Sequence, residues 1–408
     1  MVRSSILKIE NIYRKNKDDF RALFGRHYPQ FVYRPLPFLP AGEIPVFAFH
    51  TVEADYLERQ LRYLKDNGYQ TLNATELLQT INQTRKAERN TVVLTFDDGR
   101  GSLWSIAYPL LKKYGMKAIS FVVSGVVPED KSVHPHLGQV REGTLQYDEV
   151  INREQTSPLC NWQELHEMDR NGHVDVQSHT TYHNSVFTDS RIIDFVNPGY
   201  VPSFLCSTFN PVVRINNEDR YLAQLDWGFP IYTRGASMAS DTRYIEDEKL
   251  TGQCTDHVHN NGGQDFFSRK GWRKELLGVV DDYKGSHGDS GRYQTAEERS
   301  REIYNDLVES KSTIEVRLEK EVNHLCYPWY EGSEWCARIS SEAGYLANYW
   351  GIPGNKKVIT RIGGNPYYIS RMNDEYVFCL PGKQRKSIFK VIKEKYTRRL
   401  PMLVKHAG

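Results

Sequence analysis

Long apolar runs are absent from this 408-residue sequence. The longest, residues 118–127, is broken by Ser120, Ser124 and Gly125 and falls well short of the roughly 18 apolar residues that a membrane helix needs. The first residues contain no apolar core of about 7–15 residues, so we expect no signal peptide. The six cysteines form no C-x-x-C pair, which favours reduced thiols and a cytoplasmic location.

An excess of charge of one sign is also lacking, because 53 Lys and Arg residues face 51 Asp and Glu residues. The charge is uneven along the chain: residues 383–408 hold nine basic residues and one acid, Glu394. Positive charge confined to one end argues against a nucleic-acid partner. This tail places Ile388, Phe389 and Tyr396 on one face of a basic helix. That pattern predicts peripheral contact with the anionic inner membrane leaflet, with a solvated basic helix as the alternative.

Apolar runs that alternate with amphipathic stretches make up most of the remaining sequence. The pattern predicts strands at residues 44–50, 91–99, 117–123, 173–179 and 323–329, and helices at 55–68, 102–115, 161–172, 296–320 and 333–344. Such alternation indicates an α/β fold with a parallel sheet. Residues 186–294 show only weak periodicity and are expected to form a large insertion. We therefore expect a lead-in over residues 1–42, one barrel-like domain over residues 43–382 that contains the insertion, and a basic tail over residues 383–408.

Polar side chains follow four of the predicted strands. They are His50, the adjacent pair Asp97 and Asp98, His179, and Trp329 after a proline. Because the carboxyl ends of parallel barrel strands meet at one face, these side chains are expected to share a site. Adjacent carboxylates repel each other unless a cation lies between them, which favours a functional pair. A surface turn is the alternative for this Asp-Asp-Gly sequence.

The segment His179–His183 carries two imidazoles at positions i and i+4. On a helical turn this spacing puts both on one face, as two ligands of a single metal require. Together with one carboxylate of the Asp97–Asp98 pair they make two histidines and one acid, which is typical of an open catalytic metal site. The same ligand set also serves iron oxygenases, so that chemistry remains an alternative.

These motifs, taken together, resemble a known enzyme family. The sequences TFDDG at Thr95–Gly99, SHTTYH at Ser178–His183 and YPW at Tyr327–Trp329 are similar to those of the polysaccharide deacetylases of carbohydrate esterase family 4. The early strand that ends in His50 resembles the permuted poly-N-acetylglucosamine deacetylase branch. The resemblance implies a distorted (β/α)7 barrel and a divalent metal, usually zinc (Zn2+). It also implies hydrolysis of a linear amide bond that releases acetate from an N-acetylated amino sugar.

The resemblance further implies a role for each matching residue. Asp98, His179 and His183 would bind the metal, and Asp97 would act as the general base. The backbone N–H of Trp329 would stabilise the oxyanion. His50 would be the general acid that donates a proton to the departing amine, with a buried structural histidine as the alternative.

One residue of the family pattern is missing. Where the family often has an arginine that orients the base, this sequence has Cys326, and Arg361 is the proposed substitute. Tyr327, Trp162 and Arg361 are predicted to contact the substrate, although core packing is an equal alternative for Trp162. The aromatic residues of the insertion could either cap the site by stacking on sugar rings or form the insertion's own core.

The expected function is a metal-dependent N-deacetylase. Its predicted partner is an N-acetylated glycan or glycolipid, as a lipid- or nucleotide-linked intermediate of surface polysaccharide biosynthesis. Two alternatives stay open: a deacetylase-like barrel that binds glycan without turnover, and an amide hydrolase that acts on a non-sugar substrate.

Overall fold

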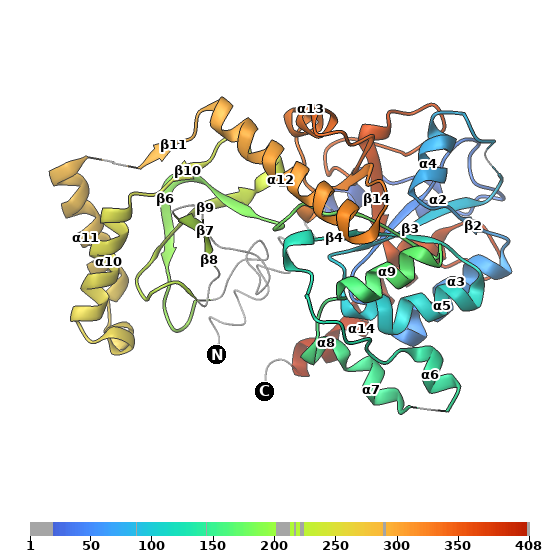
Figure 1. Cartoon of the computed structure of the whole chain (residues 1–408), viewed down its shortest axis with the longest axis horizontal. Helices are drawn as coiled ribbons and strands as arrows, with labels where there is room; N and C mark the ends of the chain where they lie inside the picture. Colours follow the sequence, from blue (N-terminus) through green and yellow to red (C-terminus); the bar gives the residue numbers. More distant parts are fainter. Residues whose placement is uncertain are drawn as a thin grey trace. The chain divides into compact units, whose positions relative to one another are not determined.

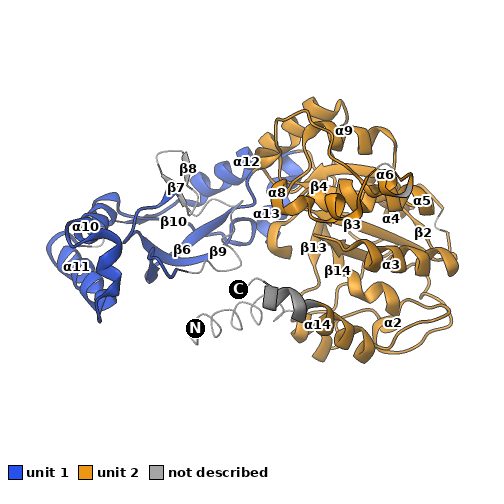
Figure 2. Cartoon of the chain, turned by 90° about the horizontal axis from the view of Figure 1, so that it is seen from below, with its two compact units in different colours: residues 1–15, 182–307, 331–343 blue, residues 16–181, 308–330, 344–408 orange. Residues whose placement is uncertain are grey.

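The structure is a computed structural model. It describes residues 19–86, 88–143, 145–200, 213–215, 218–220, 224–288 and 291–405. The chain divides into two compact units, which are coloured separately in Figure 2. Unit 1 comprises residues 1–15, 182–307 and 331–343, and unit 2 comprises residues 16–181, 308–330 and 344–408.

Unit 2 is a closed barrel of parallel strands (Figure 1). The seven strands of the ring, in spatial order, are β1 (Val46–Phe49), β14 (Ile369–Asn373), β13 (Ala347–Gly351), β12 (His324–Cys326), β5 (Val174–Ser178), β4 (Ala118–Val122) and β3 (Thr91–Asp97). The ring closes because β1 also pairs with β3, from Val46↔Val93 to Phe49↔Phe96. The short strand β2 (Gln70–Thr71) pairs with the start of β3. Only one registered pair, Leu325↔Ser178, joins β12 to β5. The predicted distorted (β/α)7 barrel is therefore confirmed.

Helices connect these strands and cover the barrel. In unit 2 they are α2 (Gln30–Tyr33), α3 (Ala54–Asp66), α4 (Ala74–Ile81), α5 (Tyr108–Tyr114), α6 (Leu137–Arg141), α7 (Tyr147–Ile151), α8 (Arg153–Thr156), α9 (Trp162–Arg170) and α14 (Ile388–Lys405). The helix α12 (Ala296–Leu318) has residues in both units, and α13 (Glu334–Glu342) belongs to unit 1. None of the described helices is long and apolar enough to span a membrane.

Local sequence determines where two of these helices begin. The Asn161 side chain accepts a hydrogen bond from the Glu164 backbone at 3.0 Å, and the Glu164 carboxylate accepts one from the Asn161 backbone at 3.2 Å. This reciprocal pair is a capping box, which starts α9 one residue after Asn161. Thr295 and Glu298 form the same arrangement before α12. Both helix starts lie where the sequence placed them.

Unit 1 has regular structure that its weak periodicity did not predict. It contains the antiparallel pair β6 (Ser185–Phe195) and β9 (Pro230–Ala236), the short pairs β7 (Val213–Ile215) with β8 (Glu218–Arg220) and β10 (Tyr244–Ile245) with β11 (Arg292–Tyr293), and the helices α10 (Glu248–Asn260) and α11 (Trp272–His287). Most aromatic residues of the insertion lie in apolar clusters inside this unit. Phe229, Tyr232 and Tyr244 belong to one cluster and Phe266 to another. They form the unit's own core, which was one of the two alternatives.

Candidate metal centre and active site

Asp97, the last residue of β3, is paired with a buried arginine. Arg371 of β14 donates from Nη1 to Asp97 Oδ1 at 2.6 Å and to Thr95 Oγ1 at 3.1 Å. Both side chains of the ion pair are almost fully buried. Burial alone would raise the pKa of Asp97, but the charges of Arg371, His179 and His50 outweigh it and hold that pKa below its usual value. Asp97 is therefore an ionised carboxylate.

Arg371 supplies the guanidinium beside Asp97 for which the sequence suggested Arg361. It comes from β14 and not from β12, where Cys326 lies. Cys326 has its thiol 3.9 Å from Asp97 Oδ1, and burial raises the pKa of that thiol well above its usual value. Arg361 does not reach the pair: it forms an isolated bridge with Glu43, ahead of β1. The proposed substitute Arg361 is thus replaced by Arg371. The local sequence does not single out Arg371, because β14 also contains the polar residues Ser370 and Asn373.

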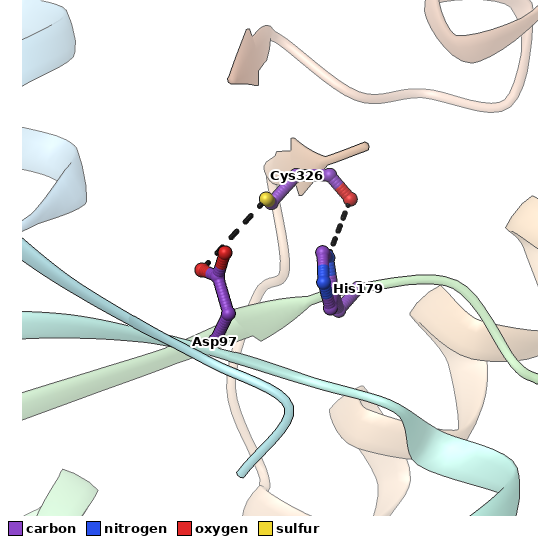
Figure 3. Close-up of side chains that lie close together, drawn as sticks. All are labelled: Asp97, His179 and Cys326. Carbon is purple, nitrogen blue, oxygen red and sulfur yellow. Dashed lines mark hydrogen bonds between the residues drawn. The ribbon is translucent and has the colours of Figure 1, made fainter. Parts of the chain in front are cut away.

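His179 is held in one orientation by the backbone of β12. Its Nδ1 donates to the carbonyl oxygen of Cys326 at 2.8 Å, as Figure 3 shows. A carbonyl oxygen can only accept, so Nδ1 carries a proton, and Nε2 lies 3.5 Å from Asp98 Oδ1. Metal-binding histidines typically donate a hydrogen bond from the ring nitrogen that does not bind the metal, which fixes the orientation of the ring and its tautomer.

The predicted metal ligands come together. Asp98, His179 and His183 each offer a ligand atom, and these atoms lie within 4.8 Å of one another. Asp98 also accepts a hydrogen bond from Arg100 at 2.8 Å. Two imidazoles and one carboxylate fit a zinc-type ion. The Nδ1 of His179 is already hydrogen-bonded to the Cys326 carbonyl, which leaves Nε2 to face the ion. The structure brings together a second group of possible ligand atoms, from Asp97, His179 and Cys326, also within 4.8 Å of one another. In this group the charge of Asp97 is already balanced by its ion pair with Arg371.

Left-handed backbone marks the loops that carry these residues. Among the described non-glycine residues with positive φ, five follow β3, β5 and β12: Asp98, Thr180, His183, Trp329 and Tyr330. Such conformations are costly for residues with a side chain and tend to collect at functional sites. They turn the chain sharply after each strand, so that neighbours such as Asp97 and Asp98 can serve different partners.

His50 lies on the open side of this group. Its Nε2 is 3.9 Å from Asp97 Oδ2, and 43% of its side chain is exposed, whereas Asp97 is only 2% exposed. The imidazole packs edge-on against Tyr330 with ring centres 5.8 Å apart. The structure therefore brings His50 next to the predicted base while leaving it accessible. This excludes the buried structural histidine as its interpretation.

The remaining predicted site residues differ in how deeply they are buried. Trp329 is partly buried, and its φ of 61° turns the chain after β12. Tyr327 is completely buried: Asn348 donates to its hydroxyl at 2.7 Å, and its ring packs against Trp350. The structure does not support substrate contact by Tyr327, because it has no exposed surface. Trp162 is 8% exposed and lies under the guanidinium of Arg317, so packing is what the structure shows for it.

Comparison with known proteins agrees with the motifs. Residues 84–197 match the family model described as polysaccharide deacetylase. A Bacillus subtilis (strain 168) protein, YxkH, named as a candidate polysaccharide deacetylase, is 36% identical over 90 residues, which is 20% of this chain and 32% of that protein. The poly-beta-1,6-N-acetyl-D-glucosamine N-deacetylase of Escherichia coli (strain K12) is 31% identical over 134 residues, which is 32% of this chain and 18% of that protein.

These matches confirm the resemblance inferred from the sequence and agree with the expectation of a deacetylase enzyme. The chain matches only 18% to 32% of the length of these two relatives. Among solved structures, a de-N-acetylase from Aggregatibacter actinomycetemcomitans aligns with a TM-score of 0.49 and 16% identity, covering 86% of this chain and 99% of that one.

Proposed function

We propose that this chain is a metal-dependent N-deacetylase that removes the acetyl group from an N-acetylated amino sugar. The observation that carries the proposal is the division of labour between adjacent carboxylates. Asp97 is ionised and paired with the buried Arg371, whereas Asp98 faces the Nε2 of His179. A pair of acids with separate partners suits amide hydrolysis, in which one acid binds a metal and the other accepts a proton.

Asp98, His179 and His183 would hold the metal ion, for which we propose zinc. Bound there, such an ion would polarise the acetyl carbonyl and acidify a water molecule. Asp97 accepts the proton of the attacking water, because its low pKa keeps it ionised. His50 is within reach of the same carboxylate and donates a proton to the departing amine. The backbone N–H of Trp329 is the proposed oxyanion donor.

The substrate we propose is an N-acetylglucosamine-type sugar carried on a lipid or a nucleotide, as an intermediate of surface polysaccharide biosynthesis. The names of the Escherichia coli relative and of the matched family support this sugar class. A cytoplasmic location with peripheral contact at the inner membrane face belongs to the same proposal. The basic residues exposed on α14 support it, since the inner leaflet is anionic.

A non-catalytic glycan-binding barrel fits less well. The sequence feature in its favour was the missing arginine beside the base. Arg371 supplies that guanidinium from β14, so the feature is no longer present. Arg371 and Asp97 are both buried, and a barrel that only binds sugar has no need of such a pair.

The test is acetate release from the glycolipid fraction of the native organism, with wild-type protein and the Asp97→Asn variant. We expect release by the wild type and a loss on the order of 100-fold or more in the variant, because general bases contribute about that much. Zinc content and the circular dichroism spectrum should stay unchanged in the variant. Release by both proteins would show that Asp97 is not the base.

A parallel assay with nucleotide-linked N-acetyl sugars separates the two carriers. No acetate from either substrate in zinc-loaded wild type would contradict the proposed activity and favour the binding barrel. Iron content and oxygen dependence would reveal the oxygenase alternative, for which release of acetate is not expected.

A further inference from the structure

Two adjoining helical segments of unit 2 expose large aromatic side chains. Phe24, in the helical residues 19–24, is 87% exposed, and Phe389 of α14 is 81% exposed. Tyr396, two turns further along α14, is 37% exposed, and its ring stacks on Phe20 with centres 6.5 Å apart. This stacking joins the two segments. Isolated exposed apolar residues are common, but several on adjoining helices mark an interaction surface.

The opposite face of α14 is fixed to the barrel by charge. Lys395 is buried and lies 3.5 Å from both Asp19 and Glu375. Arg398, one turn later, lies 3.5 Å from Glu53 and 3.8 Å from Glu375. Val391 packs on the same side and is 2% exposed. Because these contacts determine which face of α14 points inward, Phe389 and Tyr396 are held on the outward face.

The outward side carries charge of one sign. The exposed charged residues in 19–26 and 388–398 are all basic: Arg21, Arg26, Lys390 and Lys393. The acids of these segments have cationic partners, since Asp19 lies next to Lys395 and Glu394 accepts from Lys386 at 2.6 Å. Aromatic rings surrounded by lysine and arginine match a bilayer of anionic lipids, whose headgroups attract cations and whose interface accepts aromatic rings.

We propose that Phe24, Phe389, Tyr396, Arg21, Arg26, Lys390 and Lys393 form one surface that docks on an anionic lipid bilayer. This aromatic–basic surface extends the expected membrane contact of the tail to the helical residues 19–24, which the sequence did not suggest. It is independent of catalysis, because none of its residues belongs to the predicted active site. The two exposed phenylalanine rings provide the apolar contribution to binding, and the four basic residues make it depend on lipid charge.

The experiment is co-sedimentation of the full chain with phosphatidylcholine vesicles, prepared with and without phosphatidylglycerol. We expect binding to the anionic vesicles only, weakened by added salt. The double variant Phe24→Ser/Phe389→Ser should bind at least about tenfold more weakly, because it removes the two aromatic rings that would enter the bilayer interface. Lys393→Gln should weaken binding about fivefold.

Matched controls use exposed residues elsewhere on unit 2. Val316→Ser on α12 replaces an apolar side chain that is 78% exposed by a polar one. Lys356→Gln removes an exposed positive charge. Neither should change vesicle binding. Thermal unfolding and acetate release from a soluble substrate should be the same in all variants, which separates this proposal from the proposed activity. Failure to bind anionic vesicles, equal binding to neutral ones, or dimerisation that the phenylalanine variants abolish would overturn it.

Discussion

Asp97 and Asp98 are neighbours in the chain, but each is paired with a different arginine. Asp97 is 2.6 Å from Arg371, and Asp98 is 2.8 Å from Arg100 and 3.5 Å from His179. Each carboxylate thus has its own guanidinium to offset the repulsion expected between adjacent acids. The left-handed backbone at Asp98 turns the chain at this point. Asp97 stays ionised because its pKa is held below its usual value.

Arg371→Met tests this arrangement. It leaves a buried carboxylate without its cation, so we expect a loss of stability on the order of 3–5 kcal/mol. The pKa of Asp97 should rise, which moves the acid limb of the activity–pH profile to higher pH. Arg361→Met is the matched control and should change neither quantity, because Arg361 pairs with the chain near Glu43. Chemical denaturation and a pH series of acetate release measure the two effects; an unchanged acid limb would contradict the role of Arg371.

His50→Ala tests the proposed proton donor. General acids contribute about 10²- to 10⁴-fold, so acetate release should fall by that order. The zinc content should not change, since His50 is not among the three ligands that lie together. Metal analysis of the purified variant distinguishes this outcome from loss of the ion. A leaving group that needs no proton would restore activity in the variant if His50 is the acid.

At the scale of the loops, a clamp connects the segment after β1 to the segment after β3. Glu154 of α8 accepts from Thr51 Oγ1 at 2.7 Å and from the backbone of Ser102 at 2.9 Å. The hydroxyl of Ser102 in turn accepts from the backbone of Val52 at 3.1 Å. Since Thr51 directly follows His50, we expect this clamp to help hold His50 near Asp97.

Thr51→Val removes the donor to Glu154 while keeping the shape of the side chain. We expect kcat to fall on the order of tenfold with little change in KM, because misplacing a catalytic group lowers the rate more than binding. In a His50→Ala background the same change should have almost no further effect. Thr51→Ser keeps the hydroxyl and should behave as wild type. Steady-state kinetics of the wild type, the two single variants Thr51→Val and His50→Ala, and their double variant measure the coupling. Full additivity of the two changes would show that the clamp does not act through His50.

The elements that sequence predicted are those whose signals are local. Asn161 with Glu164 and Thr295 with Glu298 cap their helices because each pair is three residues apart. Arg371 was missed because its partner is 274 positions away, and the two come together only because β1 pairs with both β14 and β3. Unit 1 was missed because its antiparallel strands β6 and β9 are interrupted by register shifts, which disturb a regular alternation.

At the scale of the whole molecule, stability should depend on an acid far from the metal ligands in sequence. Asp374 follows β14 and lies between Gln60, whose amide donates to it at 2.9 Å, and Glu375. Burial, with repulsion from Glu375, raises the pKa of Asp374 to about 7, although Gln60, Arg398 and Lys395 partly oppose the shift. The folded chain therefore keeps a proton on this carboxyl that the unfolded chain releases near pH 4.

This difference gives a pH dependence of defined sign. Between about pH 4 and pH 7 the folded state binds more protons at Asp374 than the unfolded state, so the free energy of unfolding falls as pH rises and then levels off. Asp374→Asn should remove that slope and make the protein more stable than wild type at pH 8, by on the order of 2 kcal/mol. The amide oxygen of the asparagine can still accept from Gln60. Asp66→Asn, at an exposed position, is the control and should leave the slope intact. Urea unfolding at pH 5 and pH 8 measures both, and an unchanged slope in Asp374→Asn would show that another group carries the pH dependence.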